Sequence, residues 1–262
     1  MTPVNIPLLA IDVGNTSTVL GLLQSDGTPI RSFRIRTDRD ALPDNYALMI
    51  RSLLDLAKTP EPHSAIISSV APPVGQNIML ALQAYWGIPV YEVGHHNLNV
   101  QIDLKDPTTV GADRLVNMFG VWEHVKEGKY AIIVDFGTAS TFDVIQAPRR
   151  FMGGVIAPGP STAADALFNK TAKLPRVPLI APPSAIGRTT PEAIQSGLVY
   201  GYVEMVDGMI RRLSEEMPEK PVVIATGGFA RTLMGLCRNI DVYDDDVTIK
   251  GLINIWREHA QD

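Results

Sequence analysis

The stretch Asp12-Val-Gly-Asn-Thr-Ser-Thr-Val19 follows an apolar run at residues 7–11. A matching stretch, Asp135-Phe-Gly-Thr-Ala-Ser-Thr-Phe142, lies 123 residues further on. Asp, Gly, Ser and Thr occupy the same places in both copies. Each copy joins two apolar runs, which predicts a strand, a tight polar turn and a second strand. A repeat at nearly half the length of the 262-residue chain predicts two similar domains.

The predicted elements downstream of both copies come in the same order, with strands first and then helices that alternate with strands. In the first half they are a strand at 30–35, a helix at 42–57, a strand at 65–70, a helix at 74–86 and a strand at 90–93. In the second half they are a strand at 151–156, a helix at 161–168, a strand at 222–225, a helix at 229–237 and a strand near 242. We therefore predict an α/β fold built from one unit used twice, with domains at residues 1–118 and 119–262.

Two further helices are predicted from apolar periodicity. Residues 113–125 carry a single apolar stripe, with Gly128 as a stop signal. Residues 191–213 are apolar on more than one face, so this helix lies either deep in the core or in contact with a second subunit. The second alternative places Val206 at a contact between two copies of the chain.

Composition excludes several classes of protein. The net charge of −5, with no basic stripe, argues against a nucleic-acid partner. The single cysteine, Cys237, excludes a disulfide framework and a cysteine-based zinc site, and it fits a reducing compartment. The N-terminus lacks a basic leader, and no apolar run approaches the roughly 18 residues that span a bilayer. We expect a cytoplasmic protein with no membrane partner.

The first turn suits a phosphate ligand, because Gly14 lets the backbone approach closely and the following Asn, Thr and Ser side chains supply small donors. Asp12, at a strand end, can hold Mg²⁺. The alternative is an ordinary hairpin turn whose side chains bond their own backbone. Two such turns facing each other across a cleft favour a nucleotide. Thr226-Gly-Gly228 is either a plain strand-to-helix turn or part of the binding site for the adenosine of that nucleotide.

Asp113 opens the helix that follows Gly111. It is either a first-turn carboxylate favoured by the helix dipole or a general base, and Arg114 is either a solvated charge or an anion-binding group. Asp135-Phe-Gly matches the metal motif of protein kinases, but the other kinase motifs and the P-loop are missing from the sequence. The His95-His96 pair is interpreted as a surface loop, since adjacent residues do not face one ion.

Six motifs in order resemble type III pantothenate kinases, over residues 8 to about 255. They are Asp12-x-Gly-Asn-Thr16, Gly111-Ala-Asp-Arg114, Asp135-Phe-Gly-Thr-Ala139, Gly153-Gly-Val-Ile-Ala-Pro-Gly159, Ala172-Lys-Leu-Pro175 and Ala225-Thr-Gly-Gly228. The resemblance implies a duplicated ribonuclease-H-like fold with an interdomain nucleotide cleft. It implies ATP-dependent phosphorylation of pantothenate to 4′-phosphopantothenate, the first step of coenzyme A biosynthesis. It also implies a homodimer, Mg²⁺ and a monovalent cation, K⁺ or NH₄⁺.

The same resemblance assigns roles to individual residues. Asp113 would be the catalytic proton acceptor, and Asp135 would bind the monovalent cation. The residues expected to bind ATP are Asp12, Val13, Gly14, Asn15, Thr16, Ser17, Thr18, Val19 and Thr138. The residues expected to contact pantothenate are Leu104, Gly111, Ala112, Asp113, Arg114 and Thr190.

Two positions depart from the family pattern, since Leu104 stands where the family usually has Tyr and Thr189 where it has Asn. Two rival functions remain. One is a non-catalytic regulator of the Bvg accessory factor type, against which the three aspartates Asp12, Asp113 and Asp135 argue. The other is a kinase of the same superfamily with another substrate, against which the Gly-Ala-Asp-Arg segment argues.

Overall fold

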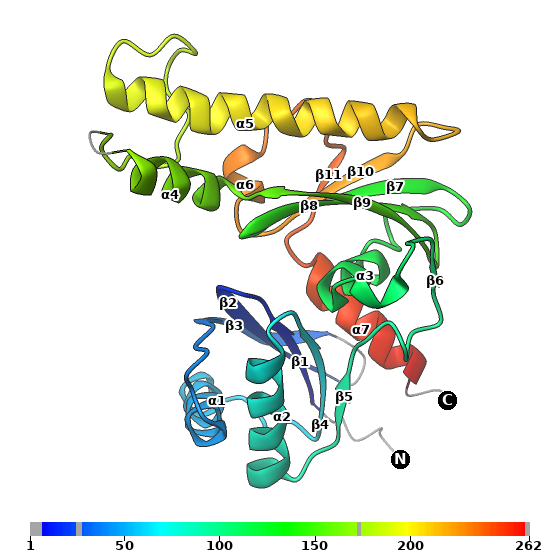
Figure 1. Cartoon of the computed structure of the whole chain (residues 1–262). Coiled ribbons are helices and arrows are strands. Elements are labelled where there is room, and N and C mark those ends of the chain that lie inside the picture. The colour runs from blue at the N-terminus through cyan, green and yellow to red at the C-terminus, as the bar shows by residue number, and fades with distance from the viewer. Residues whose placement is uncertain (1–6, 25–27, 172–173, 260–262) are drawn as a thin grey trace. The chain divides into compact units, whose positions relative to one another are not determined.

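The computed structural model describes residues 7–24, 28–171 and 174–259. The chain forms two compact units, each with its own sheet (Figure 1). Unit 1 comprises Met1–Val100, Lys105–Gly120 and Val247–Asp262, and unit 2 comprises Gln101–Leu104 and Val121–Asp246. The last helix of the chain is therefore part of unit 1.

Unit 1 contains a five-stranded sheet in the order β3-β2-β1-β4-β5. Its strands are β1 (Leu8–Val13), β2 (Ser17–Leu23), β3 (Pro29–Arg36), β4 (Ser64–Ser69) and β5 (Val90–Glu92), and its helices are α1 (Pro43–Ala57), α2 (Pro72–Trp86), α3 (Ala112–Gly120) and α7 (Val247–His259), with the 3₁₀ turn η1 (Pro107–Thr109). The first three strands are antiparallel, whereas β1, β4 and β5 are parallel.

The two faces of this sheet are covered by different helices, as strand alternation requires. Leu9, Ile11 and Val13 point into an apolar core shared with α1 and α2. The opposite face carries Ala10 and Asp12, and α3 and α7 pack on this face against β1 and β4. The C-terminal ends of β1 and β4 therefore meet the start of α3.

Unit 2 repeats this plan with the sheet order β11-β10-β7-β8-β9-β6. Its strands are β6 (Gln101–Ile102), β7 (Tyr130–Phe136), β8 (Ala139–Gln146), β9 (Arg150–Pro158), β10 (Val222–Thr226) and β11 (Val242–Tyr243), and its helices are α4 (Pro160–Lys170), α5 (Thr190–Glu215) and α6 (Ala230–Leu233). The series β9-β8-β7-β10-β11 has the order and the strand directions of β3-β2-β1-β4-β5. The predicted duplicated α/β fold is confirmed, and β6 is an addition to it.

Two predicted helices end earlier in the structure than expected. The helix expected at 113–125 ends at Gly120, where a side chain would collide with the carbonyl oxygen of Val247, and Trp122 then donates from its indole to the carbonyl of Pro148. The helix expected at 229–237 is only α6, since Gly235 adopts a φ of +81° shortly after it. Helix α5 packs into the apolar core of unit 2, where Val206 is fully buried.

The expectation that Val206 lies at a contact between subunits is therefore wrong. Its side chain packs in the core of its own unit.

None of the helices in the described ranges combines the length and the apolar character that crossing a bilayer requires.

Candidate functional site

The first turn joins β1 to β2 and is held by backbone contacts that need glycine. The amide of Gly14 donates to the carbonyl of Ser17 at 3.1 Å, and a Cβ at Gly14 would lie only 2.9 Å from the same oxygen. Thr37, after β3, donates from its hydroxyl to the carbonyl of Gly14 (2.7 Å) and from its amide to the carbonyl of Thr16 (3.0 Å). The hydroxyl groups of Thr18 and Thr37 also form a buried hydrogen bond with each other, at 3.0 Å. The turn is thus fixed in shape by a third strand.

Two arginines that the motif search missed contact this turn. Arg39 donates from Nη2 to the side-chain oxygen of Asn15 at 2.8 Å, and Arg34 donates from Nη1 to the hydroxyl of Ser17 at 3.0 Å. Both contacts are exposed to solvent. Guanidinium groups beside small polar donors suit a phosphate ligand. The turn therefore has positive side chains of its own, which come from β3 and the segment after it.

Asp113 lies in the first turn of α3, and its carboxylate is placed by two neighbours. Its Oδ1 accepts from the backbone amide of Arg114 at 2.8 Å. A Cβ at Gly111 would lie 2.5 Å from the same oxygen, so only glycine leaves room for this rotamer. Burial raises the pKa of Asp113 above its usual range, against the opposing effects of the Arg114 amide and the Arg114 charge. A carboxylate with a raised pKa is suited to accepting a proton near neutral pH.

Asp12 and Asp113 belong to the same end of the unit 1 sheet. Val70 donates its amide to the carbonyl of Val13 at 3.0 Å, and its Cγ1 lies 3.7 Å from the position a Cβ would take at Gly111. Val70 thus bridges the strand that carries Asp12 and the loop that positions Asp113. The first turn and the Gly-Ala-Asp-Arg segment, 100 residues apart, are neighbours in unit 1.

Ser68 is a further residue at this edge that sequence reasoning missed. It is the register partner of Asp12 on the adjacent parallel strand, so the two side chains share a face. Ser68 is fully buried, and among the described residues its hydroxyl has no hydrogen-bond partner. Only the pairing of β1 with β4 could have singled it out, because its sequence neighbourhood resembles any buried strand.

The second turn, in unit 2, gathers three of the glycine-containing motifs. The carbonyl of Thr138 accepts from the amide of Gly159 at 3.0 Å and from the hydroxyl of Thr162 at 2.6 Å, at the start of α4. A Cβ at Gly159 would lie 2.2 Å from the carbonyl oxygen of Gly137. Thr138 is exposed, so the turn presents its hydroxyl side chain to solvent beside a helix N-terminus.

Asp135 precedes this turn and meets the third glycine site. It is the register partner of Thr226 on β10, and a Cβ at Gly227 would lie 2.4 Å from Oδ1 of Asp135. Gly227 has a φ of +94°, a conformation that favours glycine for a second reason. The structure therefore brings the Asp135 and Thr226-Gly-Gly228 motifs together in unit 2.

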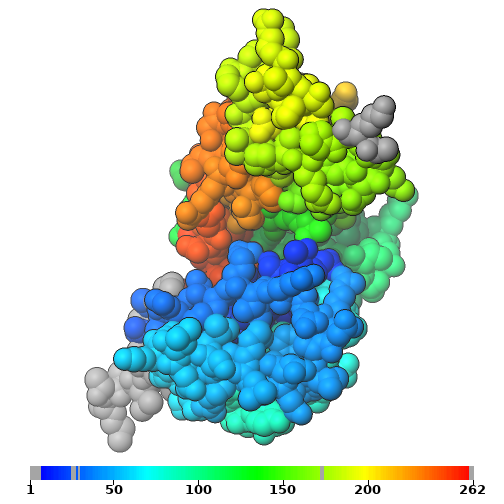
Figure 2. Space-filling view, turned by 90° about the vertical axis from the view of Figure 1, so that its left-hand side faces the viewer, coloured from blue at the N-terminus to red at the C-terminus, as the bar shows by residue number. Residues whose placement is uncertain are grey.

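The two remaining residues expected at the pantothenate site lie elsewhere in unit 2. Leu104 packs over Gly153 of β9, 3.6 Å from the position of a Cβ there. Thr190 opens α5 on the surface and lines a pocket of about 520 Å³ with Leu167, Leu174 and Ile194. In Figure 2 this end of unit 2, coloured yellow-green to yellow, is exposed at the top of the view. Ala172 and Lys173, of the fifth motif, lie outside the described residues.

Comparison with known proteins identifies one family. Residues 8–212 match the model described as type III pantothenate kinase. The type III pantothenate kinase of Deinococcus radiodurans is 50% identical over 256 residues, which cover 97% of this chain and 98% of the relative.

Solved structures share the fold at low sequence identity. A 2-dehydro-3-deoxygalactonokinase candidate from Sinorhizobium meliloti has a TM-score of 0.61 at 15% identity, covering 96% of this chain and 99% of its own. A Baf family protein from Campylobacter jejuni has a TM-score of 0.56 at 17% identity, covering 97% and 98%. A sugar-acid kinase candidate and a Baf family protein both share this fold. The fold alone therefore does not distinguish a pantothenate kinase from the two rival functions, a non-catalytic regulator and a kinase with another substrate.

Proposed function

Because the chain belongs to the type III pantothenate kinase family, we propose that it transfers the γ-phosphoryl group of ATP to the hydroxyl of pantothenate. The product is 4′-phosphopantothenate, and the reaction opens coenzyme A biosynthesis. One observation carries the proposal beyond family membership. Asp113 is a partly buried carboxylate with a raised pKa, fixed at a helix start beside Gly111, and this is what a general base requires.

The proposed mechanism uses Asp113 as the proton acceptor. A primary alcohol is a weak nucleophile near pH 7, so the ionised carboxylate removes the hydroxyl proton as the oxygen attacks the γ-phosphorus. The bond between that phosphorus and the bridging oxygen breaks, and ADP leaves with the electron pair. The proton on Asp113 then passes to solvent. The amide of Arg114 holds Oδ1 throughout, so the carboxylate keeps its orientation.

The first turn, residues 12–19, is proposed to bind the ATP phosphates. Its fixed backbone and the contacts from Arg34 and Arg39 support this role, because phosphoryl transfer depends on positioning and on neutralising the charge of the phosphate oxygens. Thr138 of the second turn is proposed to contact ATP as well. Its place at the start of α4 suits an anion.

Two cations belong to the proposal, and the residues present fit both. Asp12 offers a carboxylate at a strand end, the kind of oxygen ligand that Mg²⁺ prefers, and Mg²⁺ would neutralise phosphate charge when bound. Asp135 offers an oxygen next to Gly227, where a side chain would collide with that oxygen. We assign the K⁺ or NH₄⁺ site to Asp135.

Pantothenate is proposed to contact Gly111, Ala112, Asp113 and Arg114, with Arg114 facing its carboxylate. Leu104 and Thr190 are the other two residues that we propose to contact pantothenate. Thr190 lines a pocket whose walls all come from residues 167–198. As the family resemblance implies, we also propose a homodimer in which a second copy supplies Thr190 to the substrate. A cytoplasmic location is proposed as well, and the single, buried Cys237 fits it.

A coupled assay of ADP release tests the function. With K⁺ and Mg²⁺ present, pantothenate should stimulate ADP release, whereas pantothenol, which keeps the hydroxyl and lacks the carboxylate, should be a poor substrate. Absence of release with every acceptor would favour the regulator, and release with an unrelated alcohol but not with pantothenate would favour a different kinase.

The cation assignment has its own test. Activity should collapse when K⁺ is replaced by Na⁺ and return with NH₄⁺, and Asp135→Ala should lose this selectivity. Asp165→Ala is a matched control, since Asp165 is an exposed carboxylate that pairs with the exposed Arg176. Equal rates of the wild type in Na⁺ and K⁺ would reject the role of Asp135.

A further inference from the structure

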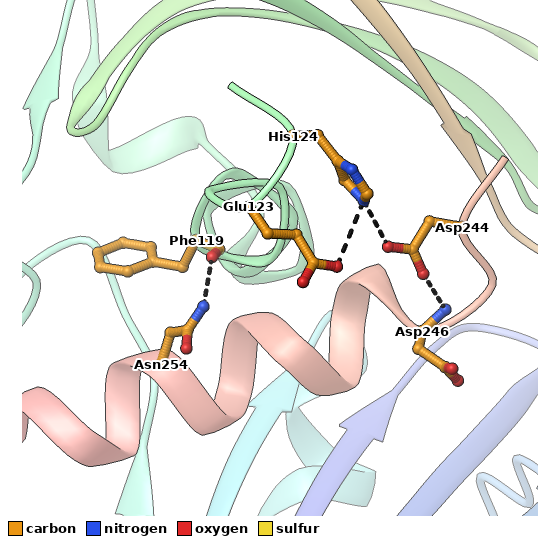
Figure 3. Close-up of polar contacts among 6 residues, drawn as sticks. All are labelled: Phe119, Glu123, His124, Asp244, Asp246 and Asn254. Atoms are coloured by element: carbon orange, nitrogen blue, oxygen red, sulfur yellow. Dashed lines mark hydrogen bonds and ion pairs between the residues drawn. The ribbon is translucent and has the colours of Figure 1, made fainter. Parts of the chain in front are cut away.

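Three potential metal ligands converge in unit 2 (Figure 3). Nε2 of His124 lies 2.7 Å from Oδ2 of Asp244 and 3.4 Å from Oε1 of Glu123. All three ligand atoms lie within 4.8 Å of one another. Among the described residues, no other group of three or more His, Cys, Asp or Glu side chains brings its ligand atoms this close together. We call Glu123, His124 and Asp244 the 124/244 cluster.

The 124/244 cluster is anchored on one side and accessible on the other. Asp244 has a side chain only 8% exposed, and its Oδ1 accepts from the amide of Asp246 at 3.0 Å while its own amide donates to Ala225 of β10. Glu123 is 55% exposed and His124 21% exposed. A buried, fixed carboxylate with an accessible Glu and His gives an ion both a defined seat and an entry path.

The donor set and its spacing fit a borderline transition metal. Zn–N and Zn–O bonds of about 2.0–2.2 Å in a tetrahedral site place neighbouring ligand atoms about 3.3–3.4 Å apart. The separation of His124 from Glu123 already has this value, and that of His124 from Asp244 must open by only about 0.6 Å. An imidazole with two carboxylates suits Zn²⁺ or Co²⁺, whereas Mg²⁺ prefers oxygen ligands alone.

We propose that the 124/244 cluster is a binding site for a divalent transition metal, with Zn²⁺ as the fitting ion. Three protein ligands leave a fourth position for water. The site uses none of the residues assigned to the other two cations, Asp12 and Asp135, and it does not rest on the proposed reaction.

Binding has a structural consequence that follows from where the cluster sits in the chain. Glu123 and His124 follow the end of α3 within four residues, and Asp244 precedes α7 by three. The chain passes between the two units at these same junctions, 120 and 246. A metal would cross-link two segments 120 residues apart, so it stabilises the folded chain by mass action.

The test uses the full chain, treated with chelator and free of nucleotide and Mg²⁺. Co²⁺ titration should produce the visible absorption of a four-coordinate site at one ion per chain, and Zn²⁺ should displace it. Zn²⁺ at 100 times its dissociation constant should raise the melting temperature by several degrees. Glu123→Gln and His124→Asn should each weaken binding at least tenfold.

Two variants serve as controls. Glu127→Gln removes a nearby exposed carboxylate outside the cluster, and His96→Asn removes a competing surface imidazole; both should bind like the wild type. Because Glu123 is exposed, Glu123→Gln keeps the fold and the test stays decisive even if a variant of Asp244 unfolds. A wild type that gives no tetrahedral Co²⁺ spectrum, or binding that His96→Asn abolishes and Glu123→Gln leaves intact, would overturn the proposal.

Discussion

At the scale of single residues, the reactivity of side chains in this protein is set by what covers them. Asp113 and Cys237 both have pKa values raised by burial, but their surroundings differ. The carboxylate of Asp113 also accepts a backbone hydrogen bond that favours its charged form. Cys237 is packed in the apolar core of unit 2 near the carboxylate of Asp207, which disfavours a thiolate further. The surroundings of Asp113 therefore suit the proposed proton transfer, whereas those of Cys237 keep its thiol protonated.

Asp113→Asn should lower turnover by roughly 10²- to 10⁴-fold, because the amide keeps the size of the side chain and loses the proton acceptor. ATP binding should change little. In the wild type, kcat/KM needs the ionised carboxylate, and the raised pKa moves the acid side of the pH profile above the pH at which an ordinary aspartate titrates. Steady-state kinetics from pH 4 to 9 measure both effects. Turnover of Asp113→Asn within a few-fold of wild type would contradict the role.

Cys237 should resist thiol reagents in the folded protein. Burial and the nearby Asp207 raise its pKa to about 12, so very little thiolate is present near pH 8. Labelling with a chromogenic disulfide should be slow at pH 8 and become rapid in denaturant. Rapid labelling of the native chain at the rate of a free thiol would show that the thiol is accessible.

At the scale of elements, α3 and α7 pack closely together through glycines. A Cβ at Gly120 would lie 1.9 Å from the carbonyl oxygen of Val247, and one at Gly251 would lie 2.0 Å from that of Val116. The pair is also joined by hydrogen bonds, from Thr248 to Asn117 and from Asn254 to the carbonyl of Phe119, the latter drawn in Figure 3. Since α3 carries Asp113, the C-terminal helix supports the proposed base.

Gly251→Ala should destabilise the protein by about 1–3 kcal/mol or more, because the added methyl group overlaps backbone atoms that cannot move aside as a side chain can. Thermal unfolding measures this. Gly208→Ala in α5 is the matched control, since the added atom there approaches only the end of the Arg211 side chain, at 3.8 Å. The control should be neutral or slightly stabilising. Equal melting temperatures for the two variants would contradict the close packing.

At the scale of the whole molecule, the same sheet order occurs in both units, and the chain returns to unit 1 to complete it. Helix α7 packs against β1, β4 and α3, so this helix completes the packing of unit 1. Helix α5 buries Val203, Val206 and Ile210 in the core that it shares with the sheet of unit 2. The proposed homodimer therefore has to use other residues.

Val206→Glu should unfold unit 2 at lower temperature, because a charge without a partner in a fully buried site costs several kcal/mol. Gly201→Glu places the same side chain on the exposed side of α5, with nothing within 4 Å, and should stay folded. Circular dichroism during heating compares the two, and sedimentation at micromolar concentration tests the proposed homodimer. A folded Val206→Glu protein would contradict the core assignment, and a monomeric wild type would reject the dimer.

The sequence alone determined the duplicated α/β fold and both polar turns, since these depend on local information. Strand alternation and turn chemistry are set within a few residues, so the two copies, the order of the elements and the positions of Gly14 and Gly137 could be predicted. The sequence also singled out Asp113 and its neighbour Gly111. Their proximity along the chain made a positioned carboxylate at a helix start recognisable.

Only the tertiary structure decided the features that depend on long-range packing. The place of α7 in unit 1, the contacts of Arg34 and Arg39 with the first turn, and the pairing of Ser68 with Asp12 join segments with no common local pattern. The burial that raises the pKa of Asp113 depends on the elements packed around it, as does the convergence of His124 with Asp244. Val206 belongs to the same class, because an apolar helix face looks the same in sequence whether a core or a partner covers it.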